Sequence, residues 1–290
     1  QRKVIFAGVT EPSAPITHGP FIGHVTSASA LVWARSSQPG QYQLSAHTGS
    51  GHRVTAKADS TTKRDGCILW RLSSLQPGTR YHYEIRLGEK RLVTGDDYFF
   101  ETTGSKRPTA VRLAFGSCAK EDDGSSAVWR QMRAVDPHAV VLLGDTPYID
   151  STDVAVQRRR YREFSAVADF RKLLRNRSLY GTWDDHDFGE NNAGNDYTER
   201  VDSQLEFLRH FDVPSDDVRY RDVGDGGQAG VYNATLFGSA AQNNRVNVIM
   251  LDARYHRSPT FLDYGACQGS ASTMLGDEQW SWLEQQMEIT

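Results

Sequence analysis

The stretch that decides the fold is Ala-Val-Val-Leu-Leu-Gly-Asp-Thr-Pro-Tyr, residues 139–148. Its first half is an unbroken apolar run, which is typical of a parallel strand buried on both faces. Its second half places Asp145 just after the strand and Tyr148 a few residues later. Ligands bind beyond the carboxyl ends of parallel strands, where a carboxylate and a phenol can share one hard cation. The stretch therefore predicts an α/β unit with a metal site at a strand end.

Two other predicted strands end in the same way. Residues 111–117 run into Cys118, and residues 179–183 run into the acidic cluster Asp-Asp-His-Asp at 184–187. Like charges this close together need a cation or a proton. A lone aspartate after a strand is usually a turn or helix cap, but these neighbours favour a metal ligand at Asp145. We therefore expect a centre that holds more than one metal ion.

The part of the chain before these motifs predicts a β-sandwich. Residues 18–102 alternate apolar and polar side chains in short runs separated by turn residues. A Pro-Gly turn precedes a strand on which Tyr81, Tyr83 and Ile85 share one face. This pattern is similar to a fibronectin type III sandwich with a tyrosine corner, in which Trp33 would be the core tryptophan.

A polar segment with Gly and Pro, residues 103–109, indicates a linker. After it, strands alternate with helices, as in an α/β domain. Helices are predicted at 154–175, 201–210 and 276–287, the last with Trp280, Leu283 and Met287 on one face, and strands at 232–237 and 246–251. We therefore divide the chain into a β-sandwich domain, 1–103, and an α/β domain, 104–290, and expect each to have its own sheet.

Composition excludes some classes of function. Charged residues make up 24% of the chain and the net charge is −3, which argues against a broad basic face for nucleic acid. The arginines at 158–160 and 162 could attract anionic substrates, but a solvated helix face is the favoured interpretation. No apolar run is long enough to span a membrane. Residues 1–4 contain no hydrophobic signal region, so export is either absent or followed by signal removal. Cys67 and Cys267 lie far apart in sequence and leave the redox compartment open.

The motifs occur in a fixed order along most of the chain. They are Phe-Gly-Ser-Cys at 115–118, Gly-Asp-x-x-Tyr at 144–148, Trp-Asp-Asp-His-Asp at 183–187, Asn-Asn at 191–192, Leu-Asp-Ala-Arg at 251–254 and Leu-Gly-Asp-Glu-Gln-Trp at 275–280. This ordered set resembles the alkaline phosphatase D (PhoD-type) family of metallophosphoesterases. The resemblance implies a layered α/β/β/α metallophosphoesterase-like domain preceded by a fibronectin type III-like sandwich.

The same resemblance implies a function and a location. The expected protein is a secreted, metal-dependent phosphoesterase that hydrolyses phosphomonoesters, phosphodiesters or both through a metal-bound hydroxide. Its expected partners are small-molecule phosphate esters, and its expected location is extracellular, periplasmic or in the cell wall, with a signal peptide already removed. Two alternatives stay open: a phospholipase-type or nucleotide-type phosphodiesterase of the same fold, and a catalytically inactive extracellular binding protein.

Specific metals follow from the donor atoms. Thiolate and phenolate are good ligands for ferric iron and poor ones for magnesium, and the alternatives for Cys118 and Tyr148 are a buried thiol and a packed aromatic ring. The resemblance implies that both residues hold Fe(III), with calcium in the adjacent positions, although another second metal stays open. We expect Asp145 to bridge the metal ions and Asp185 to bind the second one.

Four further residues have two interpretations each. Asp184 is either a ligand or a residue that orients one, and His186 lies either on the leaving-group side or behind a ligand. Asn192 is either a neutral oxygen ligand, as calcium favours, or a turn residue. Arg254 is either a bidentate phosphate clamp or the ion-pair partner of Asp252.

The sequence departs from the family pattern at one point. Family chains continue well past the motif at 275–280 and carry a Gly-Asp-x-His strand end whose side chains complete the iron site. This sequence contains no Gly-Asp-x-His. The metallophosphoesterase domain is therefore expected to be incomplete at its C-terminus, and a further segment or a second chain is expected to complete the iron site.

Overall fold

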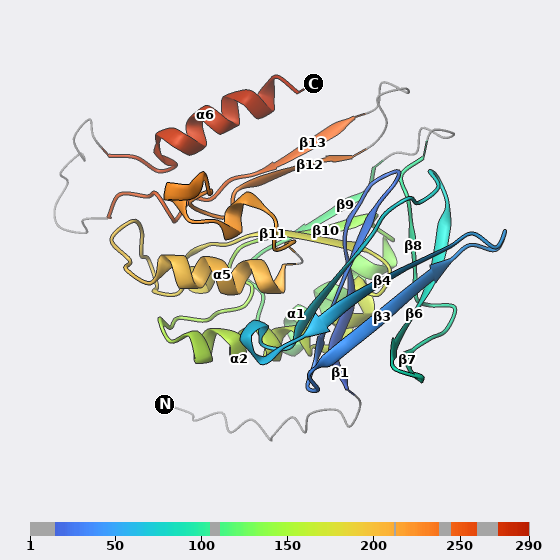
Figure 1. The fold of residues 1–290 in the computed structure, drawn as a ribbon. Coiled ribbons are helices and arrows are strands. Elements are labelled where there is room, and N and C mark those ends of the chain that lie inside the picture. Colours follow the sequence, from blue (N-terminus) through green and yellow to red (C-terminus); the bar gives the residue numbers. More distant parts are fainter. Residues whose placement is uncertain (1–14, 105–110, 212, 238–244, 260–271, 290) are drawn as a thin grey trace.

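The computed structural model describes residues 15–104, 111–211, 213–237, 245–259 and 272–289 (Figure 1). The upstream part contains β1 (Ile16–Val25), β2 (Ala30–Ser36), β3 (Gly40–His47), β4 (Arg53–Ser60), the 3-10 helix η1 (Thr62–Arg64), β5 (Cys67–Leu72), β6 (Arg80–Leu87), β7 (Lys90–Val93) and β8 (Phe99–Glu101).

The downstream part alternates strands and helices, as the sequence predicted. It contains β9 (Leu113–Gly116), α1 (Asp123–Ala134), β10 (Ala139–Leu143), α2 (Val154–Ser165), α3 (Ala168–Leu174), β11 (Ser178–Thr182), α4 (Asp185–Phe188), α5 (Arg200–His210), η2 (Val218–Tyr220), η3 (Val223–Asp225), β12 (Asn233–Phe237), β13 (Val246–Met250) and α6 (Gly276–Met287).

Two facing layers of strands form a β-sandwich. One layer is the sandwich sheet, with strand order β4-β3-β6-β7 and with β8 also paired to β6, and the other consists of β5, β2 and β1. Tyr81, Tyr83 and Ile85 of β6 all lie in the core between these layers, as their spacing predicted. The backbone N–H of Gln76 donates to the Tyr81 hydroxyl at 2.8 Å, which is the hydrogen bond of a tyrosine corner.

The tryptophan inside the sandwich is Trp70, and the sequence prediction for Trp33 is wrong. Trp70 is fully buried, and its Nε1–H donates to the carbonyl of Tyr42 at 3.1 Å. Trp33 stacks on Phe21 in a second core beneath the helices, and its Nε1–H donates to the carbonyl of Arg209 at 2.8 Å. Both faces of β2 are buried, so a tryptophan on this strand can pack either inside the sandwich or against the helices.

The expectation of separate sheets is also wrong. The strands β5-β2-β1-β11-β10-β9 form one six-stranded mixed sheet. Its two halves join where β1 runs parallel to β11, with Ile22 opposite Ser178. The all-apolar strand β10 lies between β11 and β9 and is parallel to both. The β-sandwich therefore shares a sheet with the α/β part of the chain.

The second core lies between one face of the mixed sheet and the helices α1, α2 and α3. Trp129, Phe164 and Phe170 from these helices pack against one another and against Val140 of β10. On the other face, the antiparallel pair β12–β13 adjoins β11, because the ring of Phe237 meets that of Tyr180 at 5.4 Å between centroids. Both faces of the sheet are therefore covered near β11.

The predicted helix at 154–175 is interrupted. It consists of α2 and α3, separated by Ala166 and Val167, and Val167 has a non-helical ψ of 119°. The break allows Phe170, Leu173 and Leu174 to turn beneath the mixed sheet, where all three are buried. The apolar spacing predicted the helical residues, but this change of direction depends on the packing of the sheet.

The last helix begins and ends where the sequence predicted, yet its apolar face is not buried. Trp280 is 50% exposed and Met287 is 65% exposed. The buried side chain of α6 is Gln279, whose Nε2–H donates to the carbonyl of Asp252 while its Oε1 accepts the Asp252 N–H, both at 2.8 Å. This pair of hydrogen bonds attaches α6 to the loop that follows β13, and Figure 1 shows the helix beside that strand.

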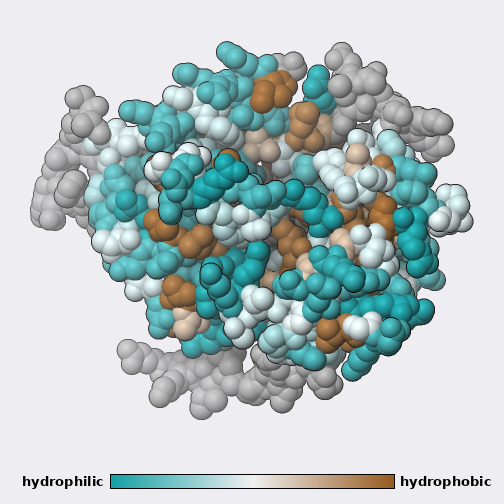
Figure 2. All heavy atoms as spheres, in the orientation of Figure 1, coloured by the Kyte–Doolittle hydropathy of each residue, from teal (hydrophilic) through white to brown (hydrophobic). Residues whose placement is uncertain are grey.

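The surface is mostly polar where Figure 2 displays it, with small separate areas of hydrophobic residues between hydrophilic ones. Two of the exposed apolar residues belong to the strands that lead to the predicted metal site. Phe115 of β9 is 50% exposed and Leu143 of β10 is 45% exposed. The outer part of the mixed sheet is therefore less completely covered by the described residues than the part near β11.

Candidate metal centre

Most of the predicted site residues follow three parallel strands that end at the same edge of the mixed sheet, whereas Asn192 follows α4 and Arg254 follows β13. β9, β10 and β11 are neighbours, with Leu142 opposite Gly116 and Leu143 opposite Thr182. The loop after β9 is held to the end of β10, since the Cys118 N–H donates to the carbonyl of Gly144 at 3.2 Å. This arrangement confirms the expected convergence of the strand ends.

The backbone at this edge adopts unusual conformations. Cys118 has a φ of 55° and Asp145 a φ of 53°, a left-handed conformation that residues other than glycine rarely adopt. Gly144 has a φ of 100°, and a Cβ there would lie only 2.4 Å from the backbone nitrogen of Asp184. The loops after β10 and β11 therefore touch through their backbones, and such strain is concentrated at functional sites.

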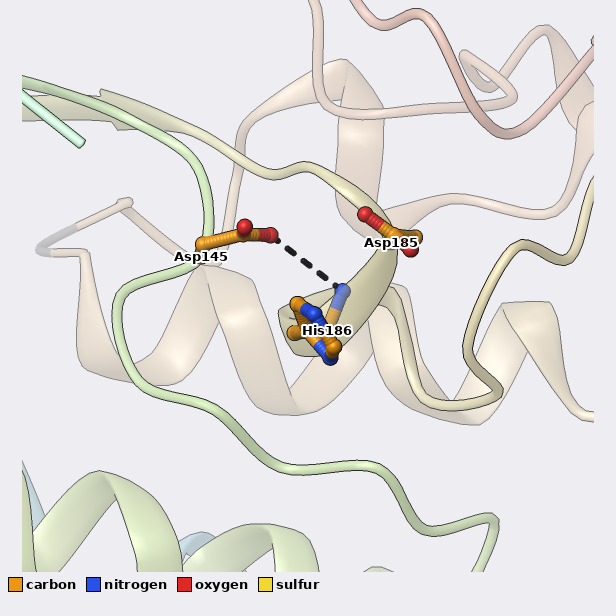
Figure 3. Close-up of side chains that lie close together, drawn as sticks. All are labelled: Asp145, Asp185 and His186. Atoms are coloured by element: carbon orange, nitrogen blue, oxygen red, sulfur yellow. Dashed lines mark hydrogen bonds between the residues drawn. The ribbon is translucent and has the colours of Figure 1, made fainter. Parts of the chain in front are cut away.

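Three side chains at this edge could hold one cation. Asp145, Asp185 and His186 each offer a ligand atom, and these atoms lie within 4.8 Å of one another (Figure 3). Asp145 comes from the loop after β10, and its Oδ1 accepts the backbone N–H of His186 at 3.4 Å. Asp145 and Asp185 are both buried. Two buried carboxylates that face each other are costly without a positive charge, so this donor set fits a metal ion.

Cys118 and Tyr148 lie beside Asp145, as the motif spacing predicted. The Cys118 Sγ is 3.5 Å from Asp145 Oδ2, and the Tyr148 hydroxyl interacts with both of these side chains. Burial, with added effects from Asp145 and Cys118, raises the pKa of Tyr148 to about 12. A phenolate therefore forms here only when a cation compensates its charge.

His186 is oriented by an aspartate that the sequence analysis did not single out. Its Nδ1 lies 2.6 Å from Asp150 Oδ1, and its ring packs on that of Tyr148 with 4.3 Å between centroids. Burial alone would lower the pKa of His186, but the hydrogen bond and charge of Asp150 and the charges of nearby aspartates raise it above its usual value. The imidazole is thus held ready to carry a proton.

Arg254 pairs with the acidic cluster, and the interpretation of a side-chain ion pair with Asp252 is wrong. Its Nε donates to Asp184 Oδ1 at 2.5 Å, and its Nη2 to Asp185 Oδ1 at 3.3 Å. Asp252 instead accepts the backbone N–H groups of Arg254 and Tyr255, at 2.8 and 2.9 Å. Asp252 therefore shapes the turn that brings the Arg254 side chain to the site.

Asp184 and Asn192 occupy different positions from the central group. Asp184 is not one of the three residues whose ligand atoms cluster. Its side chain is 41% exposed, and its carboxylate is bound to Arg254. Asn192 reaches the site through its backbone, because its N–H donates to Asp185 Oδ2 at 3.1 Å. Metal ligation by either side chain remains a prediction, and the geometry gives both a role in orienting neighbours.

The arginines of α2 are mostly not a solvated face, contrary to the sequence interpretation. Arg158 forms an ion pair with buried Glu206, and Arg162 forms one with Asp65 of the β-sandwich. Arg160 donates through Nε to the carbonyl of Tyr148 at 2.9 Å and also pairs with Glu121. Only Arg159, of these four, is mostly exposed, at 57%. This helix therefore supports the loop that carries Tyr148.

The sequence reasoning also missed Asp187, the last acidic residue of the 184–187 cluster. It is 2% exposed, and burial raises its pKa to about 8. Hydrogen bonds from three backbone N–H groups favour the ionised form and oppose this shift. Its side chain is not among the clustered ligand atoms. A helix N-terminal signature offered the only sequence signal, since Asp184 and Asp187 have the spacing of a capping box, which the structure contains.

One family model matches the downstream part of the chain. Residues 113–290 match the model of the family described as PhoD-like phosphatase. The chain belongs to the PhoD-like phosphatase family. Residues 13–103 match a separate model, described as a domain of unknown function, DUF7800. No curated protein matches the chain in a sequence comparison.

Solved structures share the fold of this PhoD-like chain at low sequence identity. A structure of PhoD matches with a TM-score of 0.75 and 18% identity, over 97% of this chain and 61% of that one. The purple acid phosphatase PPD1 from yellow lupin (Lupinus luteus) matches with a TM-score of 0.53 and 14% identity, over 76% of this chain and 43% of that one. The chain thus spans under two thirds of either protein.

Among the helices of the described residues, none combines the length and the apolar character that a membrane crossing requires. Of the three cysteines, Cys67 and Cys118 are free thiols, and Cys267 lies outside the described residues, as does most of the predicted linker at 103–109.

Proposed function

We propose that this PhoD-like chain belongs to an exported, metal-dependent phosphoesterase that acts on small phosphomonoesters, phosphodiesters or both. The observation that carries the proposal is the group of Asp145, Asp185 and His186 at the ends of parallel strands. Family membership supports phosphate-ester chemistry at that group. Export to the periplasm, cell wall or medium is supported by the family resemblance alone.

The metals form part of the proposal. Cys118, Asp145 and Tyr148 would hold Fe(III), since a thiolate and a phenolate suit ferric iron. Asp145 and Asp185 would hold calcium or another hard cation beside it, and Asp184 or Asn192 would add an oxygen. Such ions, when bound, lower the pKa of a coordinated water and neutralise phosphoryl oxygens.

The protein's own residues would bind the ester and move a proton. Arg254 is anchored through Nε and Nη2 to Asp184 and Asp185, while its buried Nη1 has no hydrogen-bond partner among the described residues. That N–H group would donate to a phosphoryl oxygen and stabilise the charge that develops on it. His186, held by Asp150, would give a proton to the departing oxygen.

We also propose that additional polypeptide, from this chain or another, completes the iron site. The three iron ligands named above are fewer than a ferric ion usually takes, and exposed Phe115 and Leu143 lie on the strands beside them.

The packing of β12–β13 on the mixed sheet and of Trp282 in α6 on Tyr232 supports an α/β/β/α layering. We keep the division of the chain into a β-sandwich domain, 1–103, and an α/β domain, 104–290, as a proposal.

The test is to compare wild type with Asp145→Ala. Purified protein would be incubated with iron and calcium, desalted, analysed for bound metal, and assayed on chromogenic phosphate monoesters and diesters. Because the Asp145 carboxylate would bind more than one metal ion, Asp145→Ala should lose bound metal and hydrolysis together. Asp96→Ala, an exposed aspartate between β7 and β8, serves as the matched control and should keep both.

Hydrolysis that survives in Asp145→Ala with full metal content would show that the centre is wrongly assigned. A wild-type chain that binds the metals but hydrolyses neither ester would instead favour a binding protein over an enzyme.

A further inference from the structure

The carboxylate of Asp187 receives backbone N–H groups from two separate loops. Its Oδ1 accepts the N–H of Asp184 at 2.7 Å and that of Asp145 at 3.1 Å. Its Oδ2 accepts the N–H of Thr146 at 3.2 Å. One buried side chain therefore satisfies three backbone donors, all of which belong to residues at the ends of β10 and β11.

These two loops carry the residues that form the candidate metal centre. Asp145 itself lies on the first loop, and Asp185 follows Asp184 on the second. The loops also meet at Gly144, where the backbone leaves no room for a Cβ. The relative position of the carboxylates of Asp145 and Asp185 therefore depends on the hydrogen bonds to Asp187.

We propose that Asp187 is a positioning residue that joins the two ligand-bearing loops and holds Asp145 and Asp185 at the separation that a metal ion requires. Asp187 contacts the backbones of the ligands and is not itself a ligand. This inference rests on the proposed metal centre. It adds a residue whose loss weakens metal binding although every proposed ligand remains.

Both carboxylate oxygens are needed for this role. An amide has only one oxygen acceptor, so Asp187→Asn would place an NH2 group against either the Thr146 N–H or the N–H groups of Asp145 and Asp184. One side of the junction would then repel its partner instead of binding it. The change keeps the size of the side chain, so loss of packing does not explain its effect.

The experiment titrates metal-free full-length protein with Mn²⁺ by isothermal calorimetry. Removing an outer partner of a metal ligand typically weakens metal affinity about 10- to 100-fold, and we expect a change of that order for Asp187→Asn. The matched control is Asp153→Asn at the N-cap of α2, where the carboxylate accepts a single helical N–H, from Ala155 at 2.7 Å. That variant should bind Mn²⁺ like wild type.

The outcomes separate this inference from the proposed function. If wild type binds no Mn²⁺, the hard-cation position proposed between Asp145 and Asp185 is wrong. If wild type binds and Asp187→Asn binds equally tightly, the positioning role is wrong. Should Asp187→Asn not fold, hydrogen exchange of metal-free wild type decides: protected amides at Asp145, Thr146 and Asp184 support the junction, and amides that exchange as fast as open loops overturn it.

Discussion

Replacing Gly144 with alanine tests the contact between the two ligand-bearing loops. The new Cβ would lie 2.4 Å from Asp184 N, 2.5 Å from Asp184 Cβ and 2.7 Å from the carbonyl carbon of Trp183. Atoms in ordinary contact stand at 3.4 Å or more. These neighbours are backbone or Cβ atoms that cannot rotate away, so the loops must separate by about 1 Å, the shortfall between those distances.

The size of the effect follows from two costs. A side chain at a φ of 100° adds roughly 1–3 kcal/mol of backbone strain. Forcing a methyl group into a closed contact adds about 1–3 kcal/mol. We therefore expect the free energy of unfolding of Gly144→Ala to fall by about 2–6 kcal/mol. The same displacement should move Asp145 away from Asp185 and weaken metal binding.

Urea denaturation and metal titration of the same samples measure both effects. Gly49→Ala is the matched control, because nothing lies within 4 Å of a Cβ at that glycine and its φ is not in the left-handed region. Its stability should stay within about 1 kcal/mol of wild type. If Gly144→Ala is as stable as Gly49→Ala and binds metal normally, the close approach of the two loops is wrong.

Three further predictions address other residues. Arg254→Lys keeps the charge but loses the planar fork, so turnover should fall on the order of tenfold to a thousandfold with metal content unchanged; an equal turnover would leave Arg254 only an ion-pairing role. Iron-loaded protein should absorb visible light, and Tyr148→Phe should shift or bleach that band; colourless protein with stoichiometric iron would exclude Tyr148 and Cys118 as ligands. Burial, aided by Arg35, lowers the pKa of His18 from 6.5 to about 3. The neutral buried ring therefore favours the folded state fully above pH 6.5, and this stability is lost as pH falls toward 3, by about 3 kcal/mol at pH 4. Urea unfolding at several pH values should show this slope, and His18→Asn should reduce it.

Sequence patterns predicted the parts of the fold that depend on local periodicity. The apolar run before Asp145 predicted β10, and the alternation at Tyr81 and Tyr83 predicted the inward face of β6. The alternation of side chains did not predict the surroundings of Trp33 on β2. Alternation assigns residues to two faces of a strand but does not indicate what packs on each face. Trp33 and Trp70 are both buried, and only the docking of helices on the mixed sheet distinguishes the core of one from that of the other.

The candidate site was likewise predictable from the sequence only in part. Strand-end position and residue type were enough to predict that Cys118, Asp145 and Tyr148 lie together. The roles of Asp150 and Asp187 depend on hydrogen bonds to a ring nitrogen and to backbone N–H groups. The Asp184 N–H lies at capping-box spacing from Asp187. The other partners come from loops that meet only after the strands have paired, so no spacing in the sequence indicates them.

The parallel pairing of β1 with β11 has a consequence for how such a chain can evolve. Two family models meet between residues 103 and 113, which would suggest segments that genes could exchange freely. A recombinant that joined residues 113–290 to an unrelated N-terminal module would leave β11 with an unpaired edge and would remove Phe21 and Trp33 from the core under the helices. Any replacement module must supply a strand and aromatic side chains at the same place, so selection should keep the two segments as a co-inherited pair.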